Sequence, residues 1–293
     1  MEGWGSGLTQ SPAKTPSAKS APLVRIQYPP QCLSFNIFKM SQTIDYFKAS
    51  RVMIDSMKEY FKKCNLHAAV LGISGGIDST LVAVLMHKVS QELRGELYDF
   101  TFYGVSIPTT TTPEEEFWAS QIVGRAFCDV FHVEKGMDKV ATRANYWVSD
   151  NKLETMTTIR SGNIKARLRM IYLYDLAKKV GGIVMGTDNF TEYLLGFSTI
   201  GGDALFDYNP IQELWKTEVF GMAEMLMDEY ASDRKFEEAA AIETSLRLKP
   251  MDGLGISSDD MVQIGARNYY DVDVILQWYL EHKDEPGYPE HIF

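Results

Sequence analysis

Residues 74–80, Ser-Gly-Gly-Ile-Asp-Ser-Thr, join two apolar segments and combine small, hydroxyl and acidic side chains. Gly75 and Gly76 allow backbone conformations and close approaches that a Cβ would prevent. The segment that follows has helical spacing, so unpaired N–H groups and the positive end of the helix dipole face whatever lies over the loop. With three neighbouring hydroxyl groups, this arrangement predicts an oxyanion or phosphate site.

Asp78 narrows that prediction, because a carboxylate at a phosphate site repels its ligand unless a metal ion lies between them. The loop therefore predicts Mg²⁺ and a polyphosphate together. It differs from the Walker A loop, because no Lys follows the glycines, and also from the G-x-G-x-x-G loop. The alternative interpretation is a tight strand-to-helix turn in which Asp78 and Ser79 cap the first helical turn.

Short apolar segments that alternate with helical patterns must position this loop. We expect strands at 67–74, 98–107, 129–134 and 181–187. We expect helices at 43–64, 78–93, 111–127, 138–147, 154–180, 211–229, 234–244, 257–266 and 269–283, and a glycine-containing loop over 188–210. This order predicts an α/β fold with a doubly wound, mostly parallel sheet and helices on both faces. Ligands of such sheets bind beyond the carboxyl ends of strands, here after Ile73, Ile107 and Met185.

The helix expected at 111–127 has the strongest start signal of the chain. Thr112 can act as N-cap, and Pro113 then occupies the first helical position. Glu115 is placed to complete a capping box.

The composition argues against several classes of protein. Hydrophobic residues make up 45% of the 293 residues, and no apolar run approaches the roughly 20 residues of a membrane span. The formal charge of −10 argues against a general nucleic-acid binder, which needs a basic face. Cys32, Cys64 and Cys128 lack C-x-x-C spacing, so we expect neither a disulfide scaffold nor a zinc ribbon, and a reducing, cytoplasmic location.

Residues 1–41 differ in composition from the rest of the chain. They are rich in Ser, Pro, Ala, Lys and Thr and contain almost no acidic residues, so we expect a disordered or extraneous segment. They lack the apolar core of a secretory signal, and an organelle transit peptide is the alternative. Residues 42–293 are expected to form a single domain.

The loop at 74–80 resembles the pyrophosphate loop of the N-type ATP pyrophosphatases, which cleave ATP between its α- and β-phosphates and adenylate a substrate. Within that class, four further segments resemble the ammonia-dependent NAD synthetases: GNIKARLRM at 162–170, the region 186–211, LWKTEV at 214–219 and DGLGIS at 252–257. Their shared order and spacing make the resemblance more specific than any single motif. It implies an adenine-nucleotide α-hydrolase-like fold.

The resemblance also implies a set of site residues. ATP would be bound by Gly72, Ile73, Ser74, Gly75, Gly76, Ile77, Asp78, Ser79, Thr187, Lys216 and Thr244, with Ser245 as the alternative to Thr244. Mg²⁺ would be held by Asp78 and Glu192. Deamido-NAD would contact Arg167 and Asp207. Asp203 would take a proton from ammonium, and together with Asp78 it would be catalytic.

Ordinary structural roles are the alternatives for several of these residues. Asn189-x-x-Glu192 is also a capping-box pattern. Lys216 could pair with Glu213 on a helix surface, three residues away. Thr187 could simply cap the helix that follows.

Two regions depart from the family pattern. Ile200 stands where the family has a Lys that contacts the substrate, which removes a cation beside a phosphorylated ligand. The family also has a His-Lys-Arg near its C-terminus that closes over the substrate, whereas here only His282 and Lys283 are adjacent.

The implied reaction has two steps. The nicotinate carboxylate of deamido-NAD attacks the α-phosphate of ATP, and ammonia then attacks the adenylate to give NAD and AMP. We expect free ammonia, or ammonia from a separate subunit, and a homodimer to which the apolar helices at 42–61 and 270–280 contribute. We expect neither nucleic acid nor membrane as a partner. The alternatives are another adenylating enzyme of the class, such as a tRNA-modifying one, and a nucleotide-binding relative with weakened turnover.

Overall fold

Four parallel strands form the centre of the fold in the computed structural model, which describes residues 44–148, 158–251, 254–256 and 259–283. The strands are β1 (Ala68–Gly72), β2 (Thr101–Ser106), β3 (Val130–Val133) and β4 (Ile183–Val184). Their order is β3-β2-β1-β4, so the chain adds strands on one side of β1 and then crosses to the other side. This reversal creates a switch point between β1 and β4, where open α/β sheets bind ligands.

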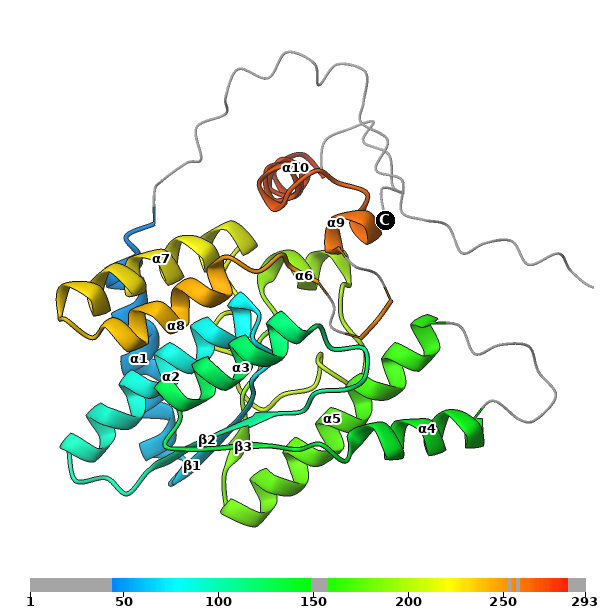
Figure 1. Cartoon of the computed structure of the whole chain (residues 1–293). Helices are drawn as coiled ribbons and strands as arrows, with labels where there is room; N and C mark the ends of the chain where they lie inside the picture. The colour runs from blue at the N-terminus through cyan, green and yellow to red at the C-terminus, as the bar shows by residue number, and fades with distance from the viewer. Residues whose placement is uncertain (1–43, 149–157, 252–253, 257–258, 284–293) are drawn as a thin grey trace, which may run out of the picture.

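Helices cover both faces of the sheet, because its strands are apolar on both sides. One face carries α1 (Tyr46–Lys63), α2 (Ile77–Gly95), α3 (Glu114–Phe127), α7 (Lys216–Ser232) and α8 (Phe236–Leu246), and the other carries α4 (Met137–Val148) and α5 (Thr158–Val180) (Figure 1). Alternation along β1 places Leu71 in the core under α2 and Val70 in the core with Leu173 of α5. The sheet is therefore buried on both sides, and ligands can approach only at its edges.

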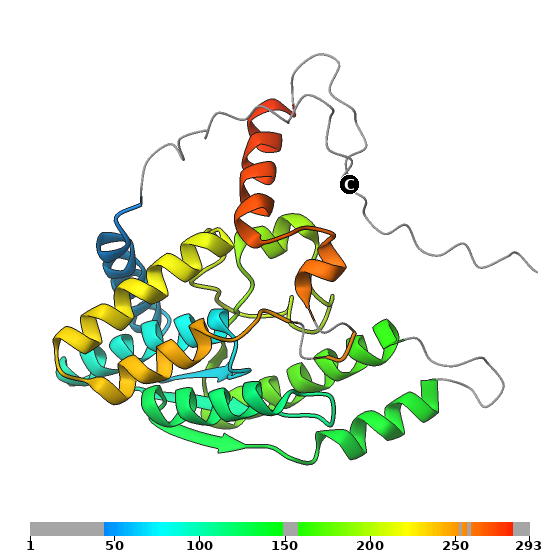
Figure 2. The same cartoon turned by 45° about the horizontal axis from the view of Figure 1, so that its top comes forward.

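A smaller apolar cluster joins the last helices to the segment after β4. It contains α6 (Phe190–Leu195), α9 (Asp260–Ile264) and α10 (Tyr269–His282). Val272 and Leu276 of α10 are buried there, and Leu195 and Trp215 pack against them. Figure 2 shows α10 rising from the body of the molecule beside α6.

The predicted doubly wound parallel sheet is confirmed, and each predicted strand and helix has its counterpart. Two local predictions were wrong. The region 188–210 contains α6 and is not loop alone. Helix α3 begins at Glu114 with Pro113 as N-cap, because the Pro113 carbonyl accepts the Phe117 N–H (3.0 Å). The hydroxyl of Thr112 instead accepts the N–H of Thr109 within the preceding turn (2.9 Å).

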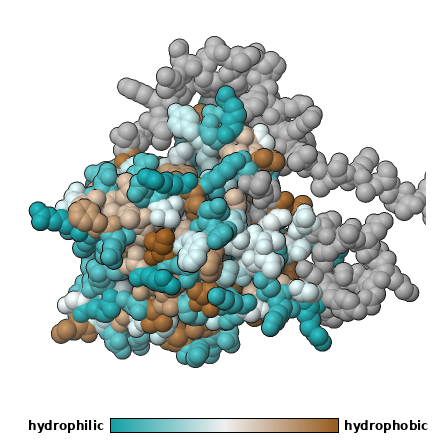
Figure 3. All heavy atoms as spheres, viewed as in Figure 1, coloured by the Kyte–Doolittle hydropathy of each residue, from teal (hydrophilic) through white to brown (hydrophobic). Residues whose placement is uncertain are grey.

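The proposed segment at 1–41 lies outside the described residues, so the division of the chain into segments stays a prediction. In the part of the chain that is described, Cys64 and Cys128 are free thiols, and burial raises the pKa of Cys128. No described helix is both long and apolar enough to cross a bilayer. On the face shown in Figure 3, polar and apolar side chains are interspersed.

Candidate active site

A cavity of about 490 Å³ lies where the switch point predicts it, beyond the carboxyl ends of β1, β2 and β4. The loop after β1 forms one wall, and α5 forms another. The end of α8, with Ser245, and the segment that follows it, with Pro250, close the cavity. A volume of this size suits one nucleotide-sized ligand.

The loop at 74–80 is held in its shape by its own hydroxyl groups. Ser74 Oγ accepts the Gly76 N–H (3.1 Å), and both Ser79 Oγ (3.1 Å) and Thr80 Oγ1 (2.9 Å) donate to the Gly76 carbonyl. Because α2 starts at Ile77, the N–H groups of its first turn have no partner within the helix. The loop therefore presents N–H donors to the cavity, as the phosphate-site prediction requires.

Gly75 is required by both conformation and space, because its φ is +96° and an added Cβ would lie 2.3 Å from the Glu116 carbonyl oxygen. Replacing Gly75 by Ala is expected to destabilise the fold by roughly 3 kcal/mol and to displace the loop. Urea unfolding measures the first effect, and ATP binding measures the second. The matched control is Gly95→Ala at the end of α2, where a Cβ meets nothing within 4 Å and unfolding should be unchanged. Equal stability of the two variants would contradict the steric argument.

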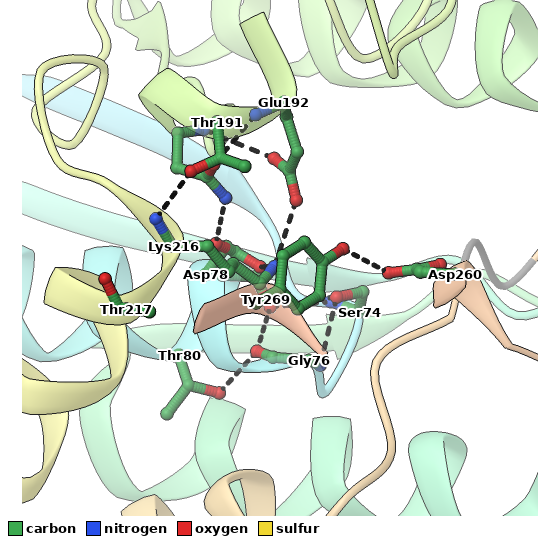
Figure 4. Close-up of polar contacts among 12 residues, drawn as sticks. Ser74, Gly76, Asp78, Thr80, Thr191, Glu192, Lys216, Thr217, Asp260 and Tyr269 are labelled. Atoms are coloured by element: carbon green, nitrogen blue, oxygen red, sulfur yellow. Dashed lines mark hydrogen bonds and ion pairs between the residues drawn. The ribbon is translucent and has the colours of Figure 1, made fainter. Parts of the chain in front are cut away.

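Three charged side chains from distant segments meet under this loop (Figure 4). Lys216 Nζ lies 2.5 Å from Asp78 Oδ2 and 3.0 Å from Glu192 Oε1. Asn189 Nδ2 donates to the second Asp78 oxygen (2.8 Å). Lys216 is only 2% exposed, which excludes the interpretation of a surface pair with Glu213. Although burial lowers it, the two carboxylates raise the pKa of Lys216 well above its ordinary value.

Glu192 forms the predicted capping box, and its carboxylate also lies in the cavity. Its Oε2 accepts the Asn189 N–H (3.2 Å), and the Asn189 side chain accepts the Glu192 N–H (3.0 Å), which completes a capping box at the start of α6. Its other oxygen faces Lys216. The cap thus fixes the carboxylate in the cavity. Burial raises the pKa of Glu192, and the single ammonium it shares with Asp78 offsets this only in part.

Two further carboxylates line the cavity. Asp203 accepts the Thr199 N–H (2.6 Å), and its pKa is raised by burial. Asp188 follows Thr187 directly, and both line the cavity. Burial, followed by the charge of Asp203, raises the pKa of Asp188 to about 8. Two partly desolvated acidic side chains therefore lie beside the ion cluster formed by Asp78, Glu192 and Lys216.

Besides Gly75 of the loop, three of the predicted residues lie outside the lining of this cavity, as far as the described residues define it. Asp207 accepts the Val184 N–H (2.9 Å) and the Tyr174 hydroxyl (3.3 Å), which ties it to the sheet. Arg167 Nε donates to the Ile200 carbonyl (3.1 Å), and the Ile200 side chain is 85% exposed. The third is Thr244, whose hydroxyl donates to the Ala240 carbonyl within α8.

Other predicted residues do line the cavity, and so do several that the motifs did not single out. From the predicted set these are Gly72, Ile73, Ser74, Gly76, Ile77, Asp78, Ser79, Thr187, Glu192, Asp203 and Lys216. Ser245 lines the cavity and pairs with Thr80 Oγ1 (2.8 Å). Arg169 and Asp188 join them. Asp188 could have been found from its place at the end of a buried strand, which is the signal that identified Thr187.

The ion cluster has the donor set that a magnesium ion uses. Among the described residues, no three His, Cys, Asp or Glu side chains come together as a metal site. Mg²⁺, however, commonly takes one or two carboxylates and completes its shell with water and substrate phosphate. Asp78 and Glu192 share one cation in the structure, so their oxygens are already directed at a common point.

Comparison with known proteins identifies the family and the fold. The family model described as NAD synthase matches residues 49–289. The NH(3)-dependent NAD(+) synthetase of Methanococcoides burtonii is 33% identical over 239 residues, covering 80% of each chain. The NAD+ synthetase structure from Burkholderia pseudomallei is 25% identical, with a TM-score of 0.57 over 84% of this chain and 92% of that one. The NMN synthetase structure from Francisella tularensis shares the fold, with a TM-score of 0.67 at 22% identity over 80% of this chain and 87% of that one.

Proposed function

This chain belongs to the NAD synthase family, and on that premise we propose that its cavity joins ammonia to deamido-NAD with cleavage of ATP to AMP and pyrophosphate. The enzyme is a ligase that forms NAD. One observation carries the assignment of the site. Asp78, Glu192 and Lys216 come from three separate family segments and meet at one point under the N–H groups of the 74–80 loop.

In the adenylation step, the loop and the lysine act on the phosphates of ATP. The N–H groups of the first turn of α2 bind the phosphate oxygens, with the helix dipole in support. Lys216 leaves its two carboxylates, at least in part, and donates to the phosphate oxygens on which charge develops. Thr187 binds the nucleotide from the end of β4, and Ser245 closes the adenine side.

We propose that Asp78 and Glu192 hold Mg²⁺ with ATP. These two carboxylates would hold an ion that, when bound, would supply Lewis-acid stabilisation of the leaving pyrophosphate. The capping box fixes Glu192, and Asn189 fixes Asp78 from the same helix start. Both carboxylates are thus preorganised, and the ion needs no rearrangement of the backbone to reach them.

In the second step, Asp203 accepts a proton from ammonium and releases ammonia to attack the adenylate. A general base works best when its pKa lies near the working pH, and burial shifts Asp203 in that direction. Its position is fixed by the Thr199 N–H. Asp188 supplies a second carboxyl group at the same wall, where it can retain ammonium.

The binding of deamido-NAD, the assembly state and the location of the protein belong to the same proposal. Arg167 and Asp207 would contact the dinucleotide outside the cavity described here. Exposed apolar side chains on α1, Phe47 (58%) and Val52 (61%), support a homodimer. Free thiols support a reducing, cytoplasmic location.

The test is a product assay with deamido-NAD, ATP, Mg²⁺ and ammonium chloride. We expect NAD, AMP and pyrophosphate in equal amounts. Nicotinic acid mononucleotide is tested in parallel as acceptor, since one fold relative is an NMN synthetase. AMP formed only with nicotinic acid mononucleotide or a further acceptor would contradict the proposal and favour another adenylating enzyme of the class. ATP bound without pyrophosphate release would contradict it too and favour a nucleotide-binding relative with weakened turnover.

A further inference from the structure

Helix α10 reaches the ion cluster through a buried carboxylate that none of the family motifs includes. Asp273 is 2% exposed and lies on the side of α10 that faces α6 and α7. Its neighbour Val272 packs into the small apolar cluster. Burying a carboxylate in such a position costs free energy unless its oxygens accept hydrogen bonds. The partners of Asp273 therefore indicate why it is there.

Both oxygens of Asp273 bind segments that carry the site. Oδ1 accepts the hydroxyl of Thr191, the residue before Glu192 (2.5 Å). Oδ2 accepts the N–H of Thr217, the residue after Lys216 (2.9 Å). Asp273 thus bridges the backbone positions next to two members of the ion cluster.

The start of α7 depends on this bridge. Its N-cap residue, Trp215, makes no side-chain cap bond to the helix. The Lys216 N–H is instead accepted by Thr191 Oγ1 (2.8 Å), and the Thr217 N–H by Asp273. The first turn of α7 is therefore capped from α6 and α10, and the direction in which the Lys216 side chain leaves the backbone is set by those two helices.

The same helix also contacts the other end of Lys216. Lys216 Nζ lies 5.0 Å from the centroid of the Tyr269 ring, one turn before Asp273. The Tyr269 hydroxyl donates to Asp260 Oδ2 (2.7 Å), which fixes the ring (Figure 4). Helix α10 thus binds the backbone next to Lys216, at Thr217, and also contacts the Lys216 ammonium.

We propose that Asp273 is a positioning residue for the ATP site, which holds Lys216 and Glu192 at the geometry that receives the ATP phosphates. The inference rests on the proposed function of the ion cluster. It concerns ATP only, because in the described part of the chain Asp273 bonds to Thr191 and Thr217 beside the ion cluster, and neither Arg167 nor Asp207 is its partner. Loss of its two bonds must therefore weaken the use of ATP more than the use of the second substrate.

Steady-state kinetics with each substrate varied separately test the proposal. For Asp273→Ala we expect the KM for ATP to rise about tenfold, the KM for deamido-NAD to stay unchanged, and kcat to fall. Asp273→Asn should restore most of the ATP KM. Its amide oxygen can accept the Thr217 N–H, while its NH₂ donates to Thr191 Oγ1.

The control separates positioning from loss of packing. Val272 lies next to Asp273 and is 1% exposed. The substitution Val272→Ala removes only apolar contacts, so it should lower Tm and leave the KM for ATP unchanged. If Asp273→Ala raises the ATP KM no more than Val272→Ala does at a similar loss of Tm, the proposal is wrong. Thr191→Val removes the bond to Asp273 Oδ1, and with it the acceptor of the Lys216 N–H, without altering α10. This variant is used if Asp273→Ala does not fold. An unchanged ATP KM in Thr191→Val would likewise overturn the proposal.

Isothermal titration calorimetry measures ATP binding to the wild type and the variants. It distinguishes failure of the positioning role of Asp273 from failure of the proposed function. A wild type that makes no NAD refutes the reaction, whereas weaker ATP binding in Asp273→Ala still supports the positioning role. ATP binding equal to that of the wild type in Asp273→Ala refutes the positioning role even when NAD is formed.

Discussion

Replacing Asp78 by Asn is expected to reduce NAD formation by about 100- to 1000-fold. The substitution keeps the shape of the side chain, and the amide oxygen can still accept from Asn189 or Lys216. It removes the negative charge, however, so the remaining pair of Lys216 and Glu192 is neutral and attracts Mg²⁺ far less. The loss of activity should appear in the rate of pyrophosphate release. Mn²⁺ binding in the presence of ATP, measured by electron paramagnetic resonance, should weaken in parallel.

A matched variant shows whether the effect belongs to the site. Asp45 is an exposed N-cap of α1 whose side chain accepts the Lys48 N–H (3.0 Å). Asn caps helices about as well as Asp does, so Asp45→Asn should have wild-type activity. If Asp78→Asn retained activity within a few-fold of the wild type, the assignment of Asp78 to the metal and the phosphates would have to be abandoned.

The sequence allowed the centre of this site to be predicted, because it depends on local order and on the rule for parallel sheets. Apolar strands that end in Gly-rich or Thr-containing turns converge at one edge of the sheet, whatever the details of packing. Asp78, Thr187 and Glu192 lie just beyond two such ends. Their meeting therefore follows from topology, and the structure shows two of them within bonding distance of the same ammonium.

Other details depend on rotation about a helix axis, which spacing alone does not determine. Thr244 and Ser245 are adjacent on α8, yet only Ser245 faces the cavity and Thr80. Successive helical residues point about 100° apart. An error of one residue in the motif alignment thus exchanges a lining residue for one that bonds its own helix.

The contribution of α10 could not be predicted for a different reason. Asp273 lies on a helix with ordinary amphipathic spacing, and its partners are 56 and 82 residues away in sequence. No local pattern marks a carboxylate that caps another helix at such separations. Its role becomes visible only once α6, α7 and α10 are packed together.

Replacing Lys216 by Met is expected to destabilise the protein by roughly 3–5 kcal/mol in the absence of ligands. Met fills most of the same volume, but Asp78 and Glu192 then face each other without their shared cation. The variant should also lose about 100-fold or more in kcat/KM for ATP, because the ammonium no longer reaches the phosphates. The matched control is Lys88→Met, which breaks the more exposed ion pair with Glu229 and should cost no more than about 1 kcal/mol.

The pH dependence of the free energy of unfolding also tests the role of Lys216. The pKa of Glu192 is raised in the folded state, so the folded protein binds more protons than the unfolded one. The stability associated with the protonated form is fully present below the unfolded value of 4.5 and is lost as pH rises through the folded pKa. Removal of the ammonium raises that pKa further, so between pH 5 and 8 the free energy of unfolding should fall more steeply in Lys216→Met than in the wild type.

Added Mg²⁺ provides the decisive comparison, because a divalent cation can replace the ammonium between the two carboxylates. The Tm of Lys216→Met should rise with Mg²⁺ concentration more than that of the wild type, in which Lys216 competes for the same oxygens. Lys88→Met should follow the wild type. Equal Mg²⁺ responses in all three proteins would show that Asp78 and Glu192 do not form the magnesium site, and a stability of Lys216→Met equal to that of Lys88→Met would show that the buried ammonium is not required to hold them together.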